Sequence, residues 1–497
     1  MKSATHRQAA ALLLGLASVA GFAPAGLSFL PVLCLALLVY FWLHAPSPRT
    51  AARLGFLYGL GFFGGGVSWV YVSLHEFGMM PAALAVLATA LFCAYLALFP
   101  ALVGSLQARF EFPAIARALV LVPAFWILTE WMRGWIFTGF PWLALGYSQT
   151  DTPLAGYAPV AGMYGVSLAM ALCAGALAAA LSASRAALRI GALALAAFIY
   201  VVGALLGGIA WTTPAGPPLP VTLVQGNIEQ SLKFEPARYQ ATLELYRRLV
   251  ESARGRLVVL PETAIPRLLD TVDPAYLDDL VSLARERHAD LLIGVPFRDR
   301  SGRYYNGVVN LGESGLQFYA KQHLVPLGEF VPPEFSWIVS ELHIPLSDFS
   351  RGGSQSPMRA AGQHVAMTVC YENAFGEELI AELPQGTLLA NVSNVAWFGD
   401  SLAPAQHLQI SRMRSIETGR YMLQSTNTGI TALIDERGRV KARVAQFTEA
   451  LLEGEAQPFA GATPYVRYGN ALVLIACALA LIASVLLALV PARGSRQ

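Results

Sequence analysis

Long apolar stretches are the feature that most constrains how this chain can fold. A helix needs about 20 apolar residues to cross the hydrocarbon core of a bilayer. Stretches of suitable length and composition occur at residues 9–24, 28–43, 54–74, 81–104, 116–134, 160–182, 189–211 and 471–490. Only 13% of the residues are charged, which is about half the usual share in soluble domains. The sequence therefore predicts a polytopic α-helical membrane bundle of eight spans.

The distribution of basic residues predicts the orientation of these spans. The first two stretches could form one long span, or a helical hairpin that turns at Gly21, Pro24 and Gly26. With a hairpin, the basic residues near the spans gather on one side, which is typical of the cytoplasmic face. They are Lys2, Arg7, Arg49, Arg53, Arg109, Arg117, Arg185, Arg189, Arg493 and Arg496. We therefore expect a hairpin, and residues 213–468 on the non-cytoplasmic side.

The first stretch could instead be a cleaved signal peptide, because Lys2 and Arg7 precede an apolar segment. No polar segment separates it from the second stretch, so we expect it to be retained. The chain then divides into a membrane domain at 1–212 with seven spans, an outer domain at 213–468, and a last span with a cytoplasmic tail at 469–497. The net charge of +2 gives no indication of a nucleic-acid partner.

The outer domain has the pattern of an α/β fold. Short apolar runs with β-branched residues predict strands at 220–224, 257–260, 291–296, 308–311, 364–369, 388–392 and 430–434. Longer segments of helical character lie between them, at 237–253, 274–287, 377–382 and 405–418. Strands that alternate with helices are typical of layered α/β domains. The polar segment 435–438 predicts a hairpin turn.

Three chemically active residue types follow apolar runs of this kind, two of them given above and the third at 318–320. Cys370 is the only cysteine of the outer domain, so it is either a small buried hydrophobe or a working thiol. It directly follows the run 365–369, at the kind of strand end where α/β domains place their chemistry. Glu262 follows the run 257–260, and Lys321 follows 318–320. A thiol becomes a strong nucleophile only as the thiolate, which a nearby base or cation favours.

These segments resemble the three motifs of the nitrilase superfamily, whose members use a Glu–Lys–Cys triad on an αββα sandwich. The motifs are Leu260-Pro261-Glu262-Thr263, the segment 319–329, and Val369-Cys370-Tyr371-Glu372. Together with the spans, the segments 134–142, 224–228 and 391–401 narrow the resemblance to the apolipoprotein N-acyltransferase family. Two positions depart from the family pattern: Val395 stands where an acidic residue is expected, and Phe234 where relatives can carry Trp.

The resemblance implies a function in bacterial lipoprotein maturation at the inner membrane, with the catalytic domain in the periplasm. The enzyme would transfer an acyl chain from a phospholipid to the N-terminal α-amine of a diacylated apolipoprotein, through a thioester on Cys370. Glu262 would be the general base, and Lys321 would stabilise the oxyanion with the backbone N–H of Tyr371. Glu329 and Glu372 would support the triad together with Tyr371. Substrate-binding residues would include Phe234 and Trp397.

Two other functions share some of these features. A membrane-tethered amidase would use the same triad, although hydrolysis of a small amide needs no spans. A transporter or scaffold would carry ionisable residues within its spans, and these spans have almost none. We expect no cofactor, and no metal at His323, because no second ligand lies at a suitable spacing. The segments 337–339 and 345–349 are candidate lids.

Overall fold

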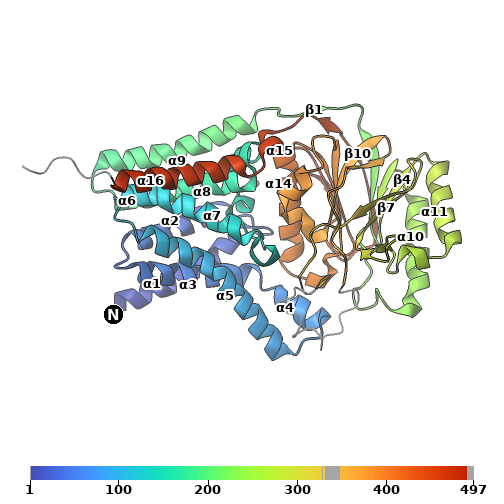
Figure 1. The fold of residues 1–497 in the computed structure, drawn as a ribbon, viewed down its shortest axis with the longest axis horizontal. Helices are drawn as coiled ribbons and strands as arrows, with labels where there is room; N and C mark the ends of the chain where they lie inside the picture. Colours follow the sequence, from blue (N-terminus) through green and yellow to red (C-terminus); the bar gives the residue numbers. More distant parts are fainter. Residues whose placement is uncertain (1, 327, 331–347, 490–497) are drawn as a thin grey trace, which may run out of the picture. The chain divides into compact units, whose positions relative to one another are not determined.

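The computed structural model describes residues 2–326, 328–330 and 348–489 (Figure 1). The chain divides into two compact units. Unit 1 comprises residues 1–71, 81–209 and 467–497, and unit 2 comprises residues 72–80 and 210–466. The candidate lid at 337–339 and most of that at 345–349 lie outside the described residues.

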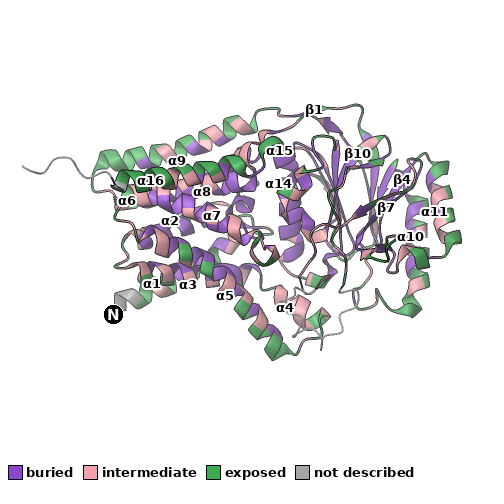
Figure 2. Ribbon diagram, viewed as in Figure 1, coloured by how far each residue is buried: buried purple, intermediate pink, exposed green. Residues whose placement is uncertain are grey.

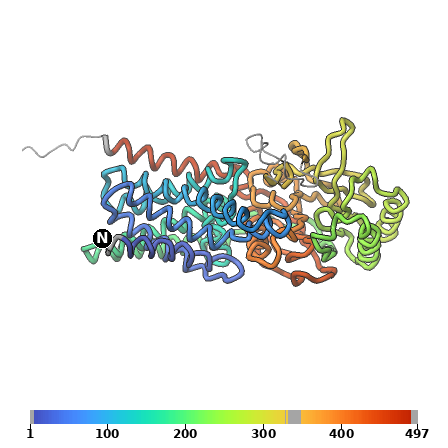
Figure 3. The backbone as a smooth tube through the Cα atoms, turned by 90° about the horizontal axis from the view of Figure 1, so that it is seen from below, coloured from blue at the N-terminus to red at the C-terminus, as the bar shows by residue number. Residues whose placement is uncertain are grey.

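Unit 1 consists of helices that run alongside one another (Figure 3). They are α1 (Lys2–Ser18), α2 (Phe29–Leu43), α3 (Pro48–Gly66), α5 (Ala82–Gln107), α6 (Ala114–Ala116), α7 (Val122–Arg133), α8 (Ala158–Ser182), α9 (Ala186–Gly207) and α16 (Ala471–Leu489). Helix α8 is largely buried, whereas α9 is largely exposed although its sequence is apolar (Figure 2). An exposed apolar surface of this kind suits a lipid environment rather than water.

Four segments of the described chain are long and apolar enough to cross a membrane. They are Ala82–Gln107, Ala114–Arg133, Pro153–Ser182 and Ala186–Gly207. The stretch expected at 54–74 is not one continuous helix, because Pro48–Gly66 and Val70–Phe77 meet at 58°. That pair could supply a fifth span, while Phe29–Leu43 and Ala471–Leu487 are shorter apolar helices. The protein is a membrane protein, but eight spans are not confirmed.

Unit 2 contains two six-stranded sheets. The first has the order β15-β2-β3-β4-β7-β8 and the second β14-β13-β12-β11-β10-β9. The strands of the first are β15 (Ala450–Ala456), β2 (Leu219–Gln225), β3 (Leu257–Val259), β4 (Asp290–Gly294), β7 (Gly307–Gly312) and β8 (Gln317–Ala320). Those of the second are β14 (Val440–Arg443), β13 (Ala432–Ile434), β12 (Met422–Thr426), β11 (Leu388–Ser393), β10 (Gln363–Val369) and β9 (Met358–Ala360).

The two sheets pack face to face between two layers of helices. Alternate residues of β2, β3, β10 and β11 form a shared core, which contains Leu223, Val259, Met367 and Ala390. Helices α10 (Tyr239–Ser252) and α11 (Pro274–Glu286) cover the outer face of the first sheet. Helices α13 (Gly376–Ile380) and α14 (Ala403–Thr418) cover the second. Unit 2 is thus an αββα sandwich (Figure 1).

The strand directions determine which connecting segments lie at the carboxyl ends of the parallel strands. Strands β2, β3 and β4 are parallel, and so are β10, β11 and β12. Strand β7 runs antiparallel to β4, and β8 returns antiparallel to β7 with Ala320 opposite Gly307. The residue after β8 therefore lies at the carboxyl end of β3 and β4. This register places Lys321 on the same edge as Glu262.

The apolar runs predicted most strands of the two six-stranded sheets, but not β9, β12 or β15. Strand β12, Met422–Thr426, ends in polar residues, and β15 carries Glu453, Gly454 and Glu455 because it pairs with β2 at the edge of its sheet. Neither has the apolar run that marks a doubly covered strand. The hairpin turn expected at 435–438 does join two antiparallel strands, β13 and β14.

One buried carboxylate connects the two sheets. Asp290, fully buried at the start of β4, accepts hydrogen bonds from Ser314 N at 2.8 Å and Ser314 Oγ at 2.5 Å. It also accepts one from the backbone N–H of Ala361, between β9 and β10, at 2.6 Å. The two carboxylate oxygens of Asp290 thus fix the β7–β8 turn of the first sheet and the β9–β10 turn of the second.

Asp290→Asn should lower the stability of the protein by about 1–3 kcal/mol, because an amide nitrogen cannot accept the hydrogen bonds that these donors make. The change would be measured as the thermal unfolding midpoint of the full-length protein in detergent. Asp278→Asn on the exposed face of α11 is the matched control and should stay near the wild-type midpoint. Equal midpoints for both variants would show that Asp290 does not join the sheets.

Candidate active site

Glu262 follows strand β3 after Leu260 and Pro261, and three polar groups converge on its carboxylate. Asn306 Nδ2 donates to Oε1 at 2.7 Å, and the backbone N–H of Asn394 donates to Oε2 at 2.8 Å. Lys321 Nζ lies 3.7 Å from Oε1. The side chain is nearly buried, so these contacts replace the water that an exposed carboxylate would bind.

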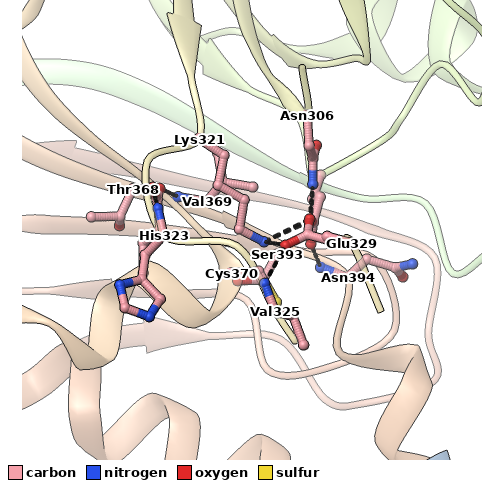
Figure 4. Close-up of polar contacts among 12 residues, drawn as sticks. Asn306, Lys321, His323, Val325, Glu329, Thr368, Val369, Cys370, Ser393 and Asn394 are labelled. Atoms are coloured by element: carbon pink, nitrogen blue, oxygen red, sulfur yellow. Dashed lines mark hydrogen bonds and ion pairs between the residues drawn. The ribbon is translucent and has the colours of Figure 1, made fainter. Parts of the chain in front are cut away.

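Lys321 is buried and lies between two carboxylates. Its Nζ is 2.8 Å from Glu329 Oε2 and 3.7 Å from Glu262 Oε1. Asn306 joins the same two carboxylates through its amide nitrogen, which is 2.6 Å from Glu329 Oε1. The backbone N–H of Val325 also donates to Glu329, at 2.8 Å. Figure 4 shows Lys321, Glu329 and Asn306 gathered beside Cys370.

Cys370 occupies the turn between β10 and the short helix η10 (Cys370–Ala374). Its φ angle is +56°, which costs a non-glycine residue about 1–3 kcal/mol. The turn is held by two donors to the Cys370 carbonyl, Asn391 Nδ2 at 3.2 Å and the His407 ring at 3.2 Å. Strain that is fixed in this way is typical of residues with a chemical role.

The segment after β11 supplies a donor that both reacting groups share. The backbone N–H of Asn394 bonds to Glu262 and also lowers the pKa of Cys370 through a hydrogen bond. The Asn394 side chain is fixed by Gln230 at 2.7 Å and by Asn427 at 3.0 Å. Glu262, Cys370 and Asn394 thus form one connected arrangement.

Glu372 links two strand ends next to the site. It is buried and accepts from the backbone N–H of Val369 at 2.6 Å, that of His323 at 3.0 Å, and that of Gln322. It therefore ties the segment after β8 to the end of β10. Tyr371 packs its ring against Phe375, at 5.1 Å between centroids.

The remaining expected residues lie on two loops. Trp397, in the short helix η11 (Val395–Phe398), is exposed by 36% of its surface. Its carbonyl accepts from Ser73 Oγ at 2.8 Å, and its ring lies 6.1 Å from that of Phe77. Phe234 is exposed by 39%. Its neighbour Lys233 is buried, and Lys233 Nζ donates to the Glu262 carbonyl at 3.0 Å.

The resting protonation states suit a base and a thiol that exchange a proton. Burial raises the pKa of Cys370, the Glu262 carboxylate raises it further, and Lys321 opposes both. Burial alone would also raise the pKa of Glu262, but Lys321, the Asn306 hydrogen bond, Lys233 and Asn394 together hold it below its usual range. At neutral pH the thiol is therefore protonated and the carboxylate is ionised.

The pKa values of two other buried groups near the site, Glu372 and His407, are also shifted. Burial raises the pKa of Glu372 to about 7, although Lys321 and backbone N–H groups lower it. Burial lowers the pKa of His407 to about 4, so this ring is neutral at physiological pH. Among the described residues, no group of three His, Cys, Asp or Glu side chains is arranged to hold a metal ion.

Comparison with known proteins supports the resemblance seen in the motifs. Residues 14–176 match the family model described as apolipoprotein N-acyltransferase N-terminal domain, and residues 220–465 match the carbon-nitrogen hydrolase model. A Nitrosomonas europaea protein named apolipoprotein N-acyltransferase is 51% identical over 490 residues, which cover 97% of each chain. The chain belongs to the apolipoprotein N-acyltransferase family. The predicted family and the nitrilase-like sandwich are thus confirmed.

Two further likenesses have been found. A Methylococcus capsulatus protein of the same name is 46% identical over 458 residues, with 90% of each chain covered. Among solved structures, the C. elegans NitFhit protein has 19% sequence identity and a TM-score of 0.39. This match covers 51% of our chain and 63% of that chain.

The structure adds site residues that the sequence analysis did not single out. Asn306 lies at the start of β7, where nothing in its neighbourhood suggested a role. Asn394 stands in the segment 391–401, which resembles the N-acyltransferase family, and Lys233 stands next to Phe234, but neither residue was selected from the sequence. The motif around Asn394 was therefore visible in the sequence, whereas the place of Asn306 in the site depends only on strand register.

Glu262→Gln should increase the alkylation of Cys370 by iodoacetamide at neutral pH, because the neutral amide no longer raises the pKa of the thiol. The pH at half-maximal alkylation should fall toward that of an ordinary cysteine, at about 8.5. Peptide mass spectrometry would follow Cys370 separately from the other four cysteines.

Glu286→Gln on the exposed end of α11 is the matched control and should alkylate like the wild type. Slower alkylation of the Glu262→Gln variant would show that the carboxylate does not face the sulfur.

Proposed function

We propose that this membrane protein transfers an acyl chain from a phospholipid to the N-terminal α-amine of an S-diacylglyceryl-cysteine apolipoprotein. This would be the last step of bacterial lipoprotein maturation. The observation that carries the proposal is the connected Glu262–Lys321–Cys370 arrangement in a chain that belongs to the apolipoprotein N-acyltransferase family. The same arrangement is compatible with an amidase, so the acceptor must be tested.

The first half-reaction would form a thioester. The thiol proton of Cys370 passes to Glu262 as the sulfur attacks the ester carbonyl of the phospholipid. Lys321 Nζ lies 3.7 Å from the Glu262 carboxylate, and it would stabilise the negative charge on the tetrahedral oxygen, together with the backbone N–H of Tyr371. The C–O bond then breaks, Glu262 returns its proton to the leaving oxygen, and a lysophospholipid departs.

The second half-reaction would repeat this chemistry with an amine. The α-amine of the apolipoprotein attacks the thioester carbonyl, and Glu262 takes the proton that the amine loses. The C–S bond breaks, the amide forms, and Cys370 is released as its thiol. Glu329 and Glu372 would act as positioning residues, because Glu329 contacts Lys321 and Glu372 holds the loop that carries it. Phe234 and Trp397, both partly exposed, would contact the acyl chain.

The proposal places the enzyme in the bacterial inner membrane with eight spans. Residues 1–212 would contain seven of them, 213–468 would form the periplasmic catalytic domain, and 469–497 would contain the last span. The asymmetry of basic residues supports this orientation. Both substrates would then be available at the outer leaflet.

Wild-type protein incubated with phospholipid alone should gain one acyl group on Cys370, detected by intact-protein and peptide mass spectrometry.

Cys370→Ser should lose turnover, because a hydroxyl is far harder to ionise than a thiol. Lys321→Met should slow acylation about 10²–10³-fold, as expected for the loss of one oxyanion donor. A diacylated lipopeptide should then become N-acylated. Release of free fatty acid without N-acylation would indicate a hydrolase instead.

The orientation can be tested with reporter fusions. A reporter that is active only outside the cytoplasm should function after Gly302 and be silent after Arg53, Arg109, Arg185 or Arg496. A cytoplasmic reporter should give the reverse pattern. Activity of the outer reporter at Arg53 would mean that residues 9–43 cross the membrane once, which would invert every later crossing.

A further inference from the structure

Lys233 is a buried cation that the reaction described above does not use. It belongs to the loop between β2 and α10, and its side chain is 1% exposed. Its one described hydrogen bond goes from Nζ to the backbone carbonyl of Glu262, at 3.0 Å. Within the described part of the chain, it forms no ion pair closer than 4 Å. A buried ammonium group with one neutral partner is costly unless a negative charge lies nearby.

The nearest compensating charges are those of the reacting groups. The Glu262 carboxylate acts on Lys233 in the resting site, and Cys370 would do so as a thiolate. Lys321 cannot fully neutralise Glu262, because its ammonium lies 2.8 Å from Glu329 and 3.7 Å from Glu262. The site thus contains two cations, and among the described residues Glu262 is the carboxylate that raises the pKa of the second, Lys233.

We propose that Lys233 is a positioning residue whose positive charge keeps Glu262 ionised as the general base and then favours the Cys370 thiolate. The inference rests on the proposed function. During acylation the S–H bond breaks and an O–H bond forms on Glu262, so one negative charge passes from the carboxylate to the sulfur. Lys233 contacts the Glu262 carbonyl and interacts electrostatically with both groups, so its charge stabilises the site before and after the transfer.

The charge of Lys233 itself depends on pH. Burial lowers the pKa of Lys233 to about 8, although Glu262 and Cys370 oppose that shift. Below this pH the ammonium holds the pKa of Glu262 down, and above it the effect fades. The other titratable groups that interact with Glu262 or Cys370 are Lys321, Glu329 and His407.

The test compares the pH dependence of acyl-enzyme formation in wild-type protein, Lys233→Gln and Lys233→Met. Gln can still donate to the Glu262 carbonyl, so it removes the charge and keeps the contact. Met removes both, and Lys233→Arg keeps the charge. Lys441→Met, on exposed β14, is the matched control for loss of a lysine. Rapid quenching and peptide mass spectrometry would measure acylation of Cys370.

Loss of the charge should move the acid limb of the profile to higher pH by about 1 unit, the smallest effect of a cation within about 4–6 Å. On the acid side, acylation by the Gln variant should therefore be about 10-fold slower than in the wild type, and the two rates should converge at alkaline pH. Lys233→Arg should restore the acid limb of the wild-type profile. The proposal would be overturned if Lys233→Gln kept the wild-type acid limb, or if its acylation rate fell by the same factor at every pH.

A second readout does not depend on the proposed function. Alkylation of Cys370 by iodoacetamide should be slower in Lys233→Gln than in the wild type, because loss of a nearby cation raises the pKa of the thiol. This is opposite to the effect of Glu262→Gln. If no phospholipid acylates the wild type, the proposed function fails, and alkylation still decides the role of Lys233. Unchanged alkylation in the Gln variant would then overturn that role.

Discussion

The burial of the Lys321 ammonium group is the constraint on which the site depends. A buried charge is tolerated only with close partners of opposite sign, and Lys321 has them in Glu329 at 2.8 Å and Glu262 at 3.7 Å. These partners come from different segments, one after β3 and one beyond β8. The β7–β8 register must therefore be correct before the charges can meet, so the sheet geometry and the electrostatics of the site are inseparable.

The two sheets divide the chemistry between them. The first sheet carries Glu262 and Lys321, and the second carries Cys370 and Asn394. The backbone N–H of Asn394 crosses this division, because it reaches Glu262 at 2.8 Å and acts on the Cys370 thiol. Because one sheet holds Glu262 and the other holds Cys370, their relative placement depends on the core that side chains of both sheets form.

The clustering of Glu262, Lys321 and Cys370 could be predicted from the sequence because each of them stands at or just beyond the end of a strand. The pattern of apolar runs alone places Glu262, Lys321 and Cys370 at strand ends, and the motifs around them indicate the sandwich. Asn306 could not be found in this way, because its place beside two carboxylates depends on the pairing of β4 with β7. Lys233 was not selected from the sequence, and only the fold shows that it is buried. The bend of 58° near the end of the stretch at 54–74 could not be predicted, because apolar character does not reveal where a helix breaks.

The pairing of β15 with β2 has a consequence for biosynthesis. Strand β2 is the first long strand of unit 2, yet its neighbour at the sheet edge is made more than two hundred residues later. Until Ala450–Ala456 emerges from the ribosome, β2 presents unpaired backbone groups along one side, which is the usual template for aggregation. Newly made chains therefore expose the unpaired side of β2 while the residues between β2 and β15 are synthesised. We expect chaperones to matter more for this unit than its final compactness suggests.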